Sequence, residues 1–477
     1  MASGATLFAG ICQSSAAATL CVNPSGKDGC FSMISAAVAA ANPGDTIQVA
    51  QGKYFEDVVI GKPLSLIGAN SAKTIIDGTK KANGIYIDGL DNPGPPTLSE
   101  VVVTGFTIRN ANFEGILVTN ASSVTISDNR VVNNNLALVV SPPPATCPGI
   151  PPFETSEDFD CGEGIHLSGV DHSIVANNLL ENNSGGILLS DDTGATHDNL
   201  ITSNTARNNP FDCGITLASH PLYSALPSDT PRGVANNTIS GNESSGNGVA
   251  VEGAGAGVGL FVAGGPPPGG LKAGLETAGN VVIGNRLTNN GLPGVAFHLH
   301  TAYAEQNLNN NLIAGNYIAG NGADTEDAAT PGPTGINVFA TSGATTTGTV
   351  IVQNVIKDEQ VDIAVNTAGL VGAHLNNLLG KQTGVDNLGE GIVNATVNWW
   401  GCSKGPGAPG CASVVRLRVV CNITDDRRSR RVLRGVVSRE RIRGPQPRPL
   451  PRRHRLSIRR RQYQRRQALR HAGSRTQ

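Results

Sequence analysis

A short pattern of alternating apolar positions recurs along most of the chain. It consists of a glycine, an aliphatic residue, a variable residue and a second apolar residue, and successive copies begin 22 to 49 residues apart. Because alternate residues of a strand face the same side, each copy predicts a short strand with one apolar face. The copies are Gly84–Ile87, Gly115–Val118, Gly164–Leu167, Gly186–Leu189, Gly214–Leu217, Gly248–Val251, Gly294–Phe297 and Gly335–Val338.

A second pattern, rich in asparagine, precedes most of these strands. An Asn is followed two positions later by a mostly aliphatic residue and four positions later by Asn, Gly or Asp; it starts at Asn129, Asn178, Asn204, Asn237, Asn285, Asn316 and Asn354. Asn and Gly tolerate the left-handed backbone of tight turns, so each unit is predicted to hold about three short strands. One unit cannot bury its own apolar side, and stacked units form a parallel β-helix with a ladder of Asn side chains at one turn.

The N-terminal part of this solenoid is predicted to carry a cap. Ser32–Ala41 is predicted to be a helix with Ser32 as its N-cap and with an apolar face that can cover the open end of the coils. The predicted organisation is an N-terminal segment (1–30), the capping helix (31–43), the β-helix (44–426) and a C-terminal tail (427–477).

Two stretches of the chain resemble a known group of folds. The run GDTIQVAQGKYFEDVVIGKPLSLIGAN, followed by TIIDG, resembles the first coils of the pectin-lyase-like superfamily. The Asn/Gly units are similar to those of bacterial right-handed parallel β-helix repeat proteins, which include the NosD-like domains. Asn398–Gly401 with Gly405–Gly407 is similar to their closing motif. The resemblance covers about Cys21 to Cys421 and implies an all-β, right-handed parallel β-helix.

The near-zero net charge conceals two oppositely charged parts. The 477 residues hold 36 Lys plus Arg and 37 Asp plus Glu, but the tail alone contains 19 Arg and a single acidic residue, Glu440. The body is therefore acidic, which argues against nucleic-acid binding, and it has no apolar run long enough to span a membrane. Three interpretations of the tail stay open: a basic binding arm, a disordered segment, or the translation of a shifted reading frame.

The cysteines favour an oxidising compartment. Three pairs are close in sequence and are predicted to form disulfides: Cys21 with Cys30, Cys147 with Cys161, and Cys402 with Cys411. Cys213, beside a strand, is expected to be a buried apolar residue. Residues 1–20 lack a clear signal peptide, yet the disulfides favour an extracellular or periplasmic location. The chain is expected to be a monomer.

Outward positions of the predicted strands bring His and acidic residues into columns. Asp192 and His220 are expected on neighbouring coils, as are Glu252 and His298, and Asp191 replaces Asp192 if the turn begins early. A carboxylate beside an imidazole suits general acid–base work, whereas the alternative is a set of solvated surface residues. The candidate catalytic residues are Asp191, Asp192, His220, Glu252, His298 and His300, and the candidate substrate-binding residues are His166 and Asn337.

Long insertions flank the same face and are expected to form a groove. They are Leu136–Gly162, Pro221–Arg232, Gly253–Ala278 and Gly322–Thr334. The first and last are acidic, so Ca2+ is a candidate cofactor, and the alternative is a solvated acidic loop. The weak candidate ligands are Asp158, Asp160, Asp324 and Asp327. His298 and His300, two positions apart on one strand, are a second possible metal pair.

The leading functional hypothesis is an exported protein that binds, and cleaves or modifies, a polysaccharide along one sheet face. The resemblance implies a polysaccharide lyase or glycoside hydrolase if the chain is an enzyme. The body lacks the motifs of pectate lyases, pectinesterases, polygalacturonases and mannuronan epimerases, which favours the alternative of a non-catalytic adhesin or carbohydrate-binding scaffold. A NosD-like metal-handling role is disfavoured because the chain has only two Met.

Overall fold

The structure is a computed structural model. It describes residues 17–92, 97–141, 144–154, 159, 161–262, 275–299, 306–326, 328–341, 343–416 and 419–420. The chain divides into two units, Met1–Thr424 and Asp425–Gln477, and every described residue belongs to the first. The Arg-rich tail, Cys12 and Cys421 therefore lie outside the described residues.

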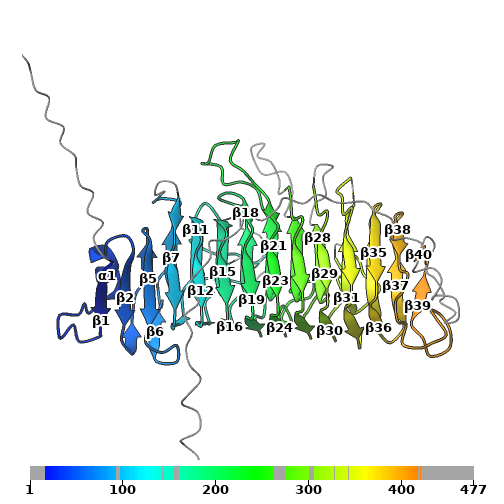
Figure 1. Cartoon of the computed structure of the whole chain (residues 1–477), viewed down its shortest axis with the longest axis horizontal. Helices are drawn as coiled ribbons and strands as arrows, with labels where there is room; N and C mark the ends of the chain where they lie inside the picture. Colours follow the sequence, from blue (N-terminus) through cyan, green and yellow to red (C-terminus); the bar gives the residue numbers. More distant parts are fainter. Residues whose placement is uncertain are drawn as a thin grey trace, which may run out of the picture. The chain divides into compact units, whose positions relative to one another are not determined.

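Within the first unit the strands of successive coils pair in parallel and stack along one axis (Figure 1). In the described residues they form sheets of 14, 11 and 15 strands. The 14-stranded sheet runs β1 (Thr19–Val22), β2 (Asp45–Val49), β5 (Leu64–Gly68), β9 (Val102–Thr104), β12 (Thr125–Ser127), β15 (Ile174–Ala176), β19 (Leu200–Thr202), β23 (Thr238–Ser240), β26 (Val281–Ile283), β29 (Leu312–Ala314), β32 (Val350–Val352), β35 (Leu370–His374), β38 (Ile392–Asn394) and β40 (Val419–Val420).

The other two sheets complete each coil. The 11-stranded sheet runs β3 (Gly52–Tyr54), β6 (Thr74–Asp77), β10 (Thr107–Arg109), β13 (Arg130–Val132), β16 (Leu179–Glu181), β20 (Thr205–Arg207), β24 (Glu243–Ser245), β27 (Arg286–Thr288), β30 (Tyr317–Ala319), β33 (Val355–Lys357) and β36 (Asn377–Leu379). The 15-stranded sheet contains β4 (Val58–Ile60), β7 (Ile85–Asp88), β11 (Ile116–Ser122), β14 (Ile165–Asp171), β17 (Ile187–Ser190), β21 (Ile215–Ser219), β25 (Val258–Val262), β28 (Val295–Leu299), β31 (Thr334–Phe339), β34 (Val361–Asn366), β37 (Thr383–Asn387) and β39 (Ser413–Val415), with β8 (Leu98–Ser99), β18 (Thr196–His197) and β22 (Val234–Ala235) beside this path.

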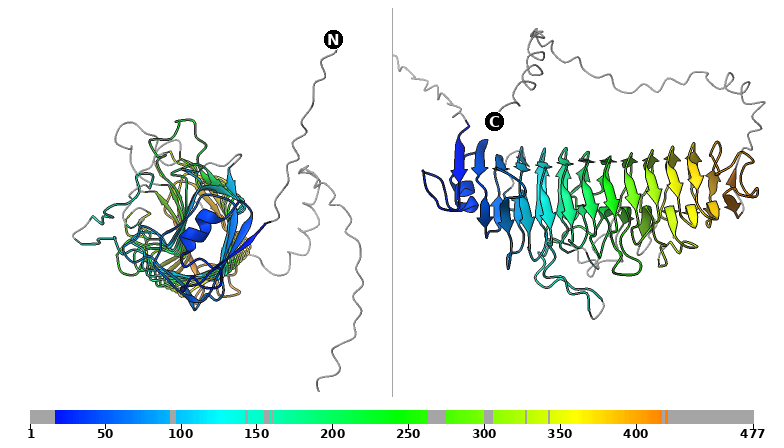
Figure 2. Two further views of the ribbon diagram at one scale, coloured as in Figure 1. Left: turned by 90° about the vertical axis from the view of Figure 1, so that its left-hand side faces the viewer. Right: turned by 90° about the horizontal axis from the view of Figure 1, so that it is seen from below.

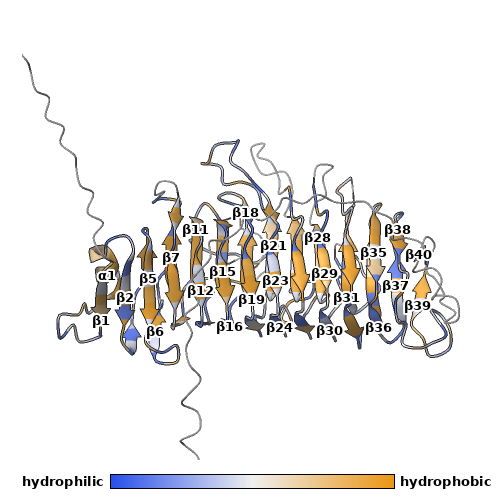
Figure 3. Ribbon diagram, viewed as in Figure 1, coloured by the Kyte–Doolittle hydropathy of each residue, from blue (hydrophilic) through white to orange (hydrophobic). Residues whose placement is uncertain are grey.

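The first and third positions after each repeat glycine point into the coil. Ile116, Ile165, Ile187 and Ile215 stand in register on neighbouring strands, and all four side chains are buried. Apolar strands thus line one continuous core, with polar residues gathered in the turns (Figure 3). The predicted parallel β-helix is confirmed.

One predicted copy of the repeat is wrong. Gly248 lies in a turn with a φ of +64°, and the next residue, Val249, is 62% exposed. The strand of this coil is β25, where Val258 pairs with Ile215 on one side and with Val295 on the other. Gly257-Val258-Gly259-Leu260 fits the same pattern, and stacking on the neighbouring coils decides between the two glycines.

Asn side chains stack at the turns as predicted, but in more than one ladder, and the predicted Asn237 stacks with Asn199 and Asn280 rather than with Asn204 and Asn285. After the first residue of a ladder, each Asn accepts from the backbone N–H and the amide of the Asn one coil earlier, as Asn242 does from Asn204 at 2.9 and 3.1 Å. One ladder contains Asn129, Asn178, Asn204, Asn242, Asn285, Asn316, Asn354, Asn376 and Asn398. A second lies five residues on and contains Asn134, Asn183, Asn209, Asn247, Asn290 and Asn321. The residues four positions on, such as Asn133, adopt the left-handed turn conformation.

The second ladder ends on a carboxylate. Glu359 occupies the next Asn position and accepts from the Asn321 backbone and amide at 3.0 Å each. Burial raises the pKa of Glu359 to about 7, against an ordinary value of 4.5, and burial raises the pKa of the nearby Asp362 to about 8. These acids hold their protons in the folded chain at pH values where the unfolded chain has lost them, so the stability that they contribute falls as pH rises from about 4.5 to about 8.

We therefore expect Glu359→Gln, which keeps the accepting oxygen without the charge, to increase the free energy of unfolding at pH 8 by about 2 kcal/mol. At pH 4.5 the variant and the wild type should be equally stable. Urea unfolding of both proteins at the two pH values measures this difference. Parallel pH dependences for the two proteins would show that the Glu359 carboxyl is not the titrating group.

The capping helix α1 (Ile34–Ala40) covers the end of the coils, and it lies across their interior in the end-on view (Figure 2). Its buried face, which includes Ile34, Ala37 and Val38, is the predicted one. The prediction of Ser32 as N-cap is wrong, because the N-cap residue is Met33, which makes no side-chain cap. Glu56 supplies the acceptor instead: its two carboxylate oxygens bind the N–H groups of Ile34 and Ser35 at 2.8 Å each. The sheet also begins earlier than predicted, at β1, within the segment assigned to residues 1–30.

The long connections project from one side of the coils (Figure 2). The predicted disulfides Cys21–Cys30, Cys147–Cys161 and Cys402–Cys411 are all formed, and the second closes the connection between β13 and β14. Cys213 is a buried free thiol, as expected. Among the described residues no helix has the length and apolar character needed to cross a membrane.

Candidate functional site

A line of polar side chains crosses three coils on the outward face of the 15-stranded sheet. His166 on β14 contacts Ser190 on β17, with Nε2 to Oγ at 2.8 Å. Ser190 Oγ donates to an Asp192 carboxylate oxygen at 2.5 Å, and both oxygens of Asp192 lie 3.2 Å from Nδ1 of His220. The expected proximity of Asp192 and His220 is therefore present, with both residues just beyond the ends of their strands.

This line of His166, Ser190, Asp192 and His220, here called the sealed line, is buried rather than open to solvent, contrary to expectation. His166, Asp192 and His220 are all buried. Burial alone would raise the pKa of Asp192, but the charge and hydrogen bond of His220 outweigh it and hold that pKa well below its ordinary value. Burial lowers the pKa of His166 to about 4, so this ring is neutral at neutral pH. Asp192 thus orients His220 through Nδ1 within a sealed network.

Asp191 has a structural role in the same turn. Its carboxylate accepts from the backbone of His220 at 2.6 Å, from Ser219 Oγ at 2.8 Å and from the backbone of Gly233 at 2.8 Å. Burial raises its pKa, although Arg232 nearby opposes the rise. These bonds hold both ends of the 221–232 connection beside β17, so Asp191 is a positioning residue.

An open cavity of about 600 Å3 lies beside this line. Its floor is formed by β21, β25 and β28. Three of the four predicted insertions supply wall residues, and the insertion 221–232 supplies none. Its lining combines aromatic rings with ionisable groups: Phe159, Phe211, Asp212, Glu252, His298 and Glu326. A glycan-sized hollow with apolar faces and a few polar groups is typical of a ligand site.

His298 on β28 lines the cavity, and its side chain is 12% exposed. Its Nδ1 lies 3.2 Å from a carboxylate oxygen of Asp324, which is fully buried. Burial alone would raise the pKa of Asp324, but the hydrogen bond and charge of His298 outweigh it and lower that pKa. Asp324 therefore stays ionised at neutral pH and fixes the ring orientation of His298, an arrangement suited to proton transfer.

Phe261 connects the cavity to the sealed line. Its ring centre lies 5.2 Å from that of His298 and 6.5 Å from that of His220. It occupies the β25 position that the sequence pattern had assigned to Glu252, because Phe261 rather than Glu252 pairs with His298 across the sheet. Glu252 is not on a strand; it reaches the cavity from the turn before β25.

The remaining predicted residues have other places. Asn337 is buried and donates its amide to the Phe297 carbonyl at 3.0 Å, so it is not placed to meet a substrate. Asp324, a predicted metal ligand, is the partner of His298 instead. His300, Asp158, Asp160 and Asp327 lie outside the described residues.

Several residues at this face were missed by sequence reasoning. Asp212 lines the cavity and accepts from Thr216 at 3.4 Å. Glu114 and Glu154 were also missed, and they form a buried cluster with the candidate residue His166 at the other end of the sealed line. Glu114 directly precedes the repeat glycine Gly115, a sequence feature that could have indicated its place beside the sheet.

Comparison with known proteins agrees with this architecture. A family model described as "Right handed beta helix region" matches residues 67–264, in agreement with the right-handed parallel β-helix fold of the described residues. No curated protein matches the sequence.

Solved structures with the same fold share little sequence with the chain. A DFA-IIIase mutant from Arthrobacter chlorophenolicus in complex with DFA-III is 12% identical at a TM-score of 0.52, covering 81% of this chain and 93% of its own. The A-module of the Azotobacter vinelandii mannuronan C-5 epimerase AlgE4 is 16% identical at 0.46, covering 75% and 92%. An alpha-1,3-glucanase catalytic unit from Streptomyces thermodiastaticus is 14% identical at 0.45, covering 81% and 64%. At these identities the likeness shows the fold alone.

Proposed function

We propose that this protein is an exported carbohydrate-active enzyme that hydrolyses a neutral polysaccharide in the cavity of the 15-stranded sheet. The observation that carries the proposal is that His298, which lines an open cavity of about 600 Å3, is held from behind by the buried carboxylate of Asp324. Three disulfides support a location in an oxidising compartment.

The lining of the cavity favours an uncharged sugar chain. Asp212, Glu252 and Glu326 contribute carboxyl groups, and the body as a whole is acidic, so a polyanionic glycan would be repelled. Phe159 and Phe211 are stacked at 6.2 Å and both line the cavity, which provides apolar surface for the faces of sugar rings. A lyase needs a uronic acid at the cleaved bond, and a neutral substrate therefore favours hydrolysis.

The proposed chemistry divides between His298 and the carboxylates. His298, held by Asp324 through Nδ1, exchanges a proton through its other nitrogen. Glu252 and Glu326 lie on the cavity wall and are the candidates for the carboxyl group that works with it, because glycosidic bonds are usually hydrolysed between two proton-transfer or nucleophilic groups.

A panel of neutral and acidic polysaccharides, with and without Ca2+, tests the proposal. We expect release of reducing ends from a neutral polysaccharide by the wild type and by His172→Ala, which removes an exposed His–Asp pair away from the cavity. Binding without any change in the glycan would replace the proposal with the binding-scaffold alternative. Release only from uronic-acid polymers would contradict the assignment of substrate and reaction.

A further inference from the structure

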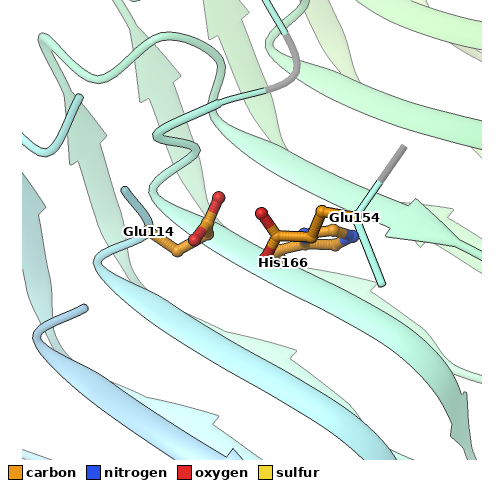
Figure 4. A group of neighbouring side chains, drawn as sticks. All are labelled: Glu114, Glu154 and His166. Carbon is orange, nitrogen blue, oxygen red and sulfur yellow. The ribbon is translucent and has the colours of Figure 1, made fainter. Parts of the chain in front are cut away.

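A buried cluster at one end of the sealed line joins three separate segments. Glu114 comes from the turn before β11, Glu154 from the connection between β13 and β14, and His166 from β14 (Figure 4). One oxygen of each carboxylate and one ring nitrogen all lie within 4.8 Å of one another. The three residues are 0%, 8% and 3% exposed, so water has little access to the space between them.

The hydrogen bond between His166 and Ser190 determines which ring nitrogen of His166 has a lone pair available to bind a ligand. Ser190 has a single hydroxyl hydrogen, and it donates to Asp192. Ser190 Oγ must therefore accept from His166 Nε2, which places the ring hydrogen on Nε2. Nδ1 then carries a lone pair, is buried, and has no hydrogen-bond partner among the described residues. A buried acceptor without a partner is costly, and a bound cation satisfies it.

We propose that Glu114, Glu154 and His166 bind one divalent transition-metal ion, with Zn2+ and Mn2+ as the probe ions. Two carboxylates and a neutral imidazole supply three ligands of suitable chemistry. The imidazole separates this set from a Ca2+ site, because Ca2+ takes oxygen ligands throughout. Ser190 and Asp192 form the outer hydrogen bonds that orient the His166 ring, as is usual for metal-bound histidine.

The ion would fix the connection between β13 and β14 to the sheet. Glu154 belongs to this connection, and so do Val140, Ala145 and Phe159 on the wall of the open cavity. The Cys147–Cys161 disulfide closes the same segment but does not tie it to the sheet. The metal site therefore holds in place a wall of the cavity, whatever reaction takes place there.

Metal binding by the intact, oxidised chain tests this inference. The protein is stripped with a chelator and dialysed, and Zn2+, Mn2+ and Ca2+ are added separately while metal content and melting temperature are measured. We expect one Zn2+ or Mn2+ per chain and a rise of several degrees in melting temperature, with no rise in the presence of Ca2+ at the same concentration.

Two substitutions locate the site. Glu154→Gln alters a residue of the connection and leaves the coils intact, and His166→Gln alters the sheet; each should weaken binding at least tenfold. Glu243→Gln, an exposed carboxylate on β24, and His172→Ala, an exposed imidazole, should bind as the wild type does. Unchanged binding in Glu154→Gln and His166→Gln, or binding of Ca2+ in preference to Zn2+ and Mn2+, would overturn the proposal.

Discussion

Replacing His298 by alanine is expected to lower kcat on the polysaccharide substrate by about 100-fold or more, with little change in binding. A positioned acid or base typically contributes a factor of this size or larger to the rate. The His298 side chain lines the cavity outside the core of the coils and is partly exposed, so its removal should leave the β-helix folded. Initial rates over a range of substrate concentrations separate kcat from KM.

Asp324→Asn provides a graded comparison with His298→Ala. Asn keeps an oxygen that can accept from the Glu326 backbone, as Asp324 does at 3.2 Å, but it lacks the charge that orients His298. Its kcat should fall less than that of His298→Ala, by about tenfold, and combining the two substitutions should add little further loss. Full activity in His298→Ala, at an unchanged melting temperature, would remove His298 from the mechanism.

Replacing Asn242 by alanine is expected to cost about 3 kcal/mol or more of folding free energy. The Asn242 amide donates to the Ile201 carbonyl at 2.9 Å and to Asn285 at 3.0 Å. Its oxygen accepts twice from Asn204, and the whole set is buried. Truncation leaves several buried polar groups without these partners, at about 1–3 kcal/mol each. Urea unfolding followed by circular dichroism measures the loss.

Ser240→Ala, two residues earlier on β23, is the matched control. It removes one partly buried hydroxyl bond, to Thr202 at 3.1 Å, and should cost less than about 1 kcal/mol. A similar small loss for Asn242→Ala would mean that the ladder contributes little to the stability of the coils.

The fold was predictable because the same pattern of residue types recurs in successive coils. Aliphatic residues flank a variable position, and Asn or Gly stands where the backbone must turn left-handed, so the β-helix and its Asn ladder follow from periodicity. The position of Glu359 in the second ladder was missed, although it stands five residues after Asn354, as Asn321 does after Asn316. The predicted pattern placed the second Asn four residues on, where the turn residue lies.

The site was harder to predict, because the connections to the 15-stranded sheet vary in length. The repeat glycine Gly186 follows the ladder residue Asn183 by three positions, whereas Gly257 follows Asn247 by ten. Because this length varies, the sequence pattern took Gly248 as the start of a strand. It therefore placed Glu252 beside His298, where the structure has Phe261. The contacts of side chains in such insertions, for example Glu154, cannot be predicted from the repeat, because the insertions do not follow its spacing.

The most direct test of the carbohydrate site is hydrogen–deuterium exchange of the chain with and without the polysaccharide that the panel identifies. The proposed site predicts slower exchange in residues 251–256 and around Glu326, the connections that line the cavity. Exchange should be unchanged at turns of the 14-stranded sheet and around the exposed Trp399. Protection confined to those distant surfaces, with none in the cavity connections, would contradict the central claim.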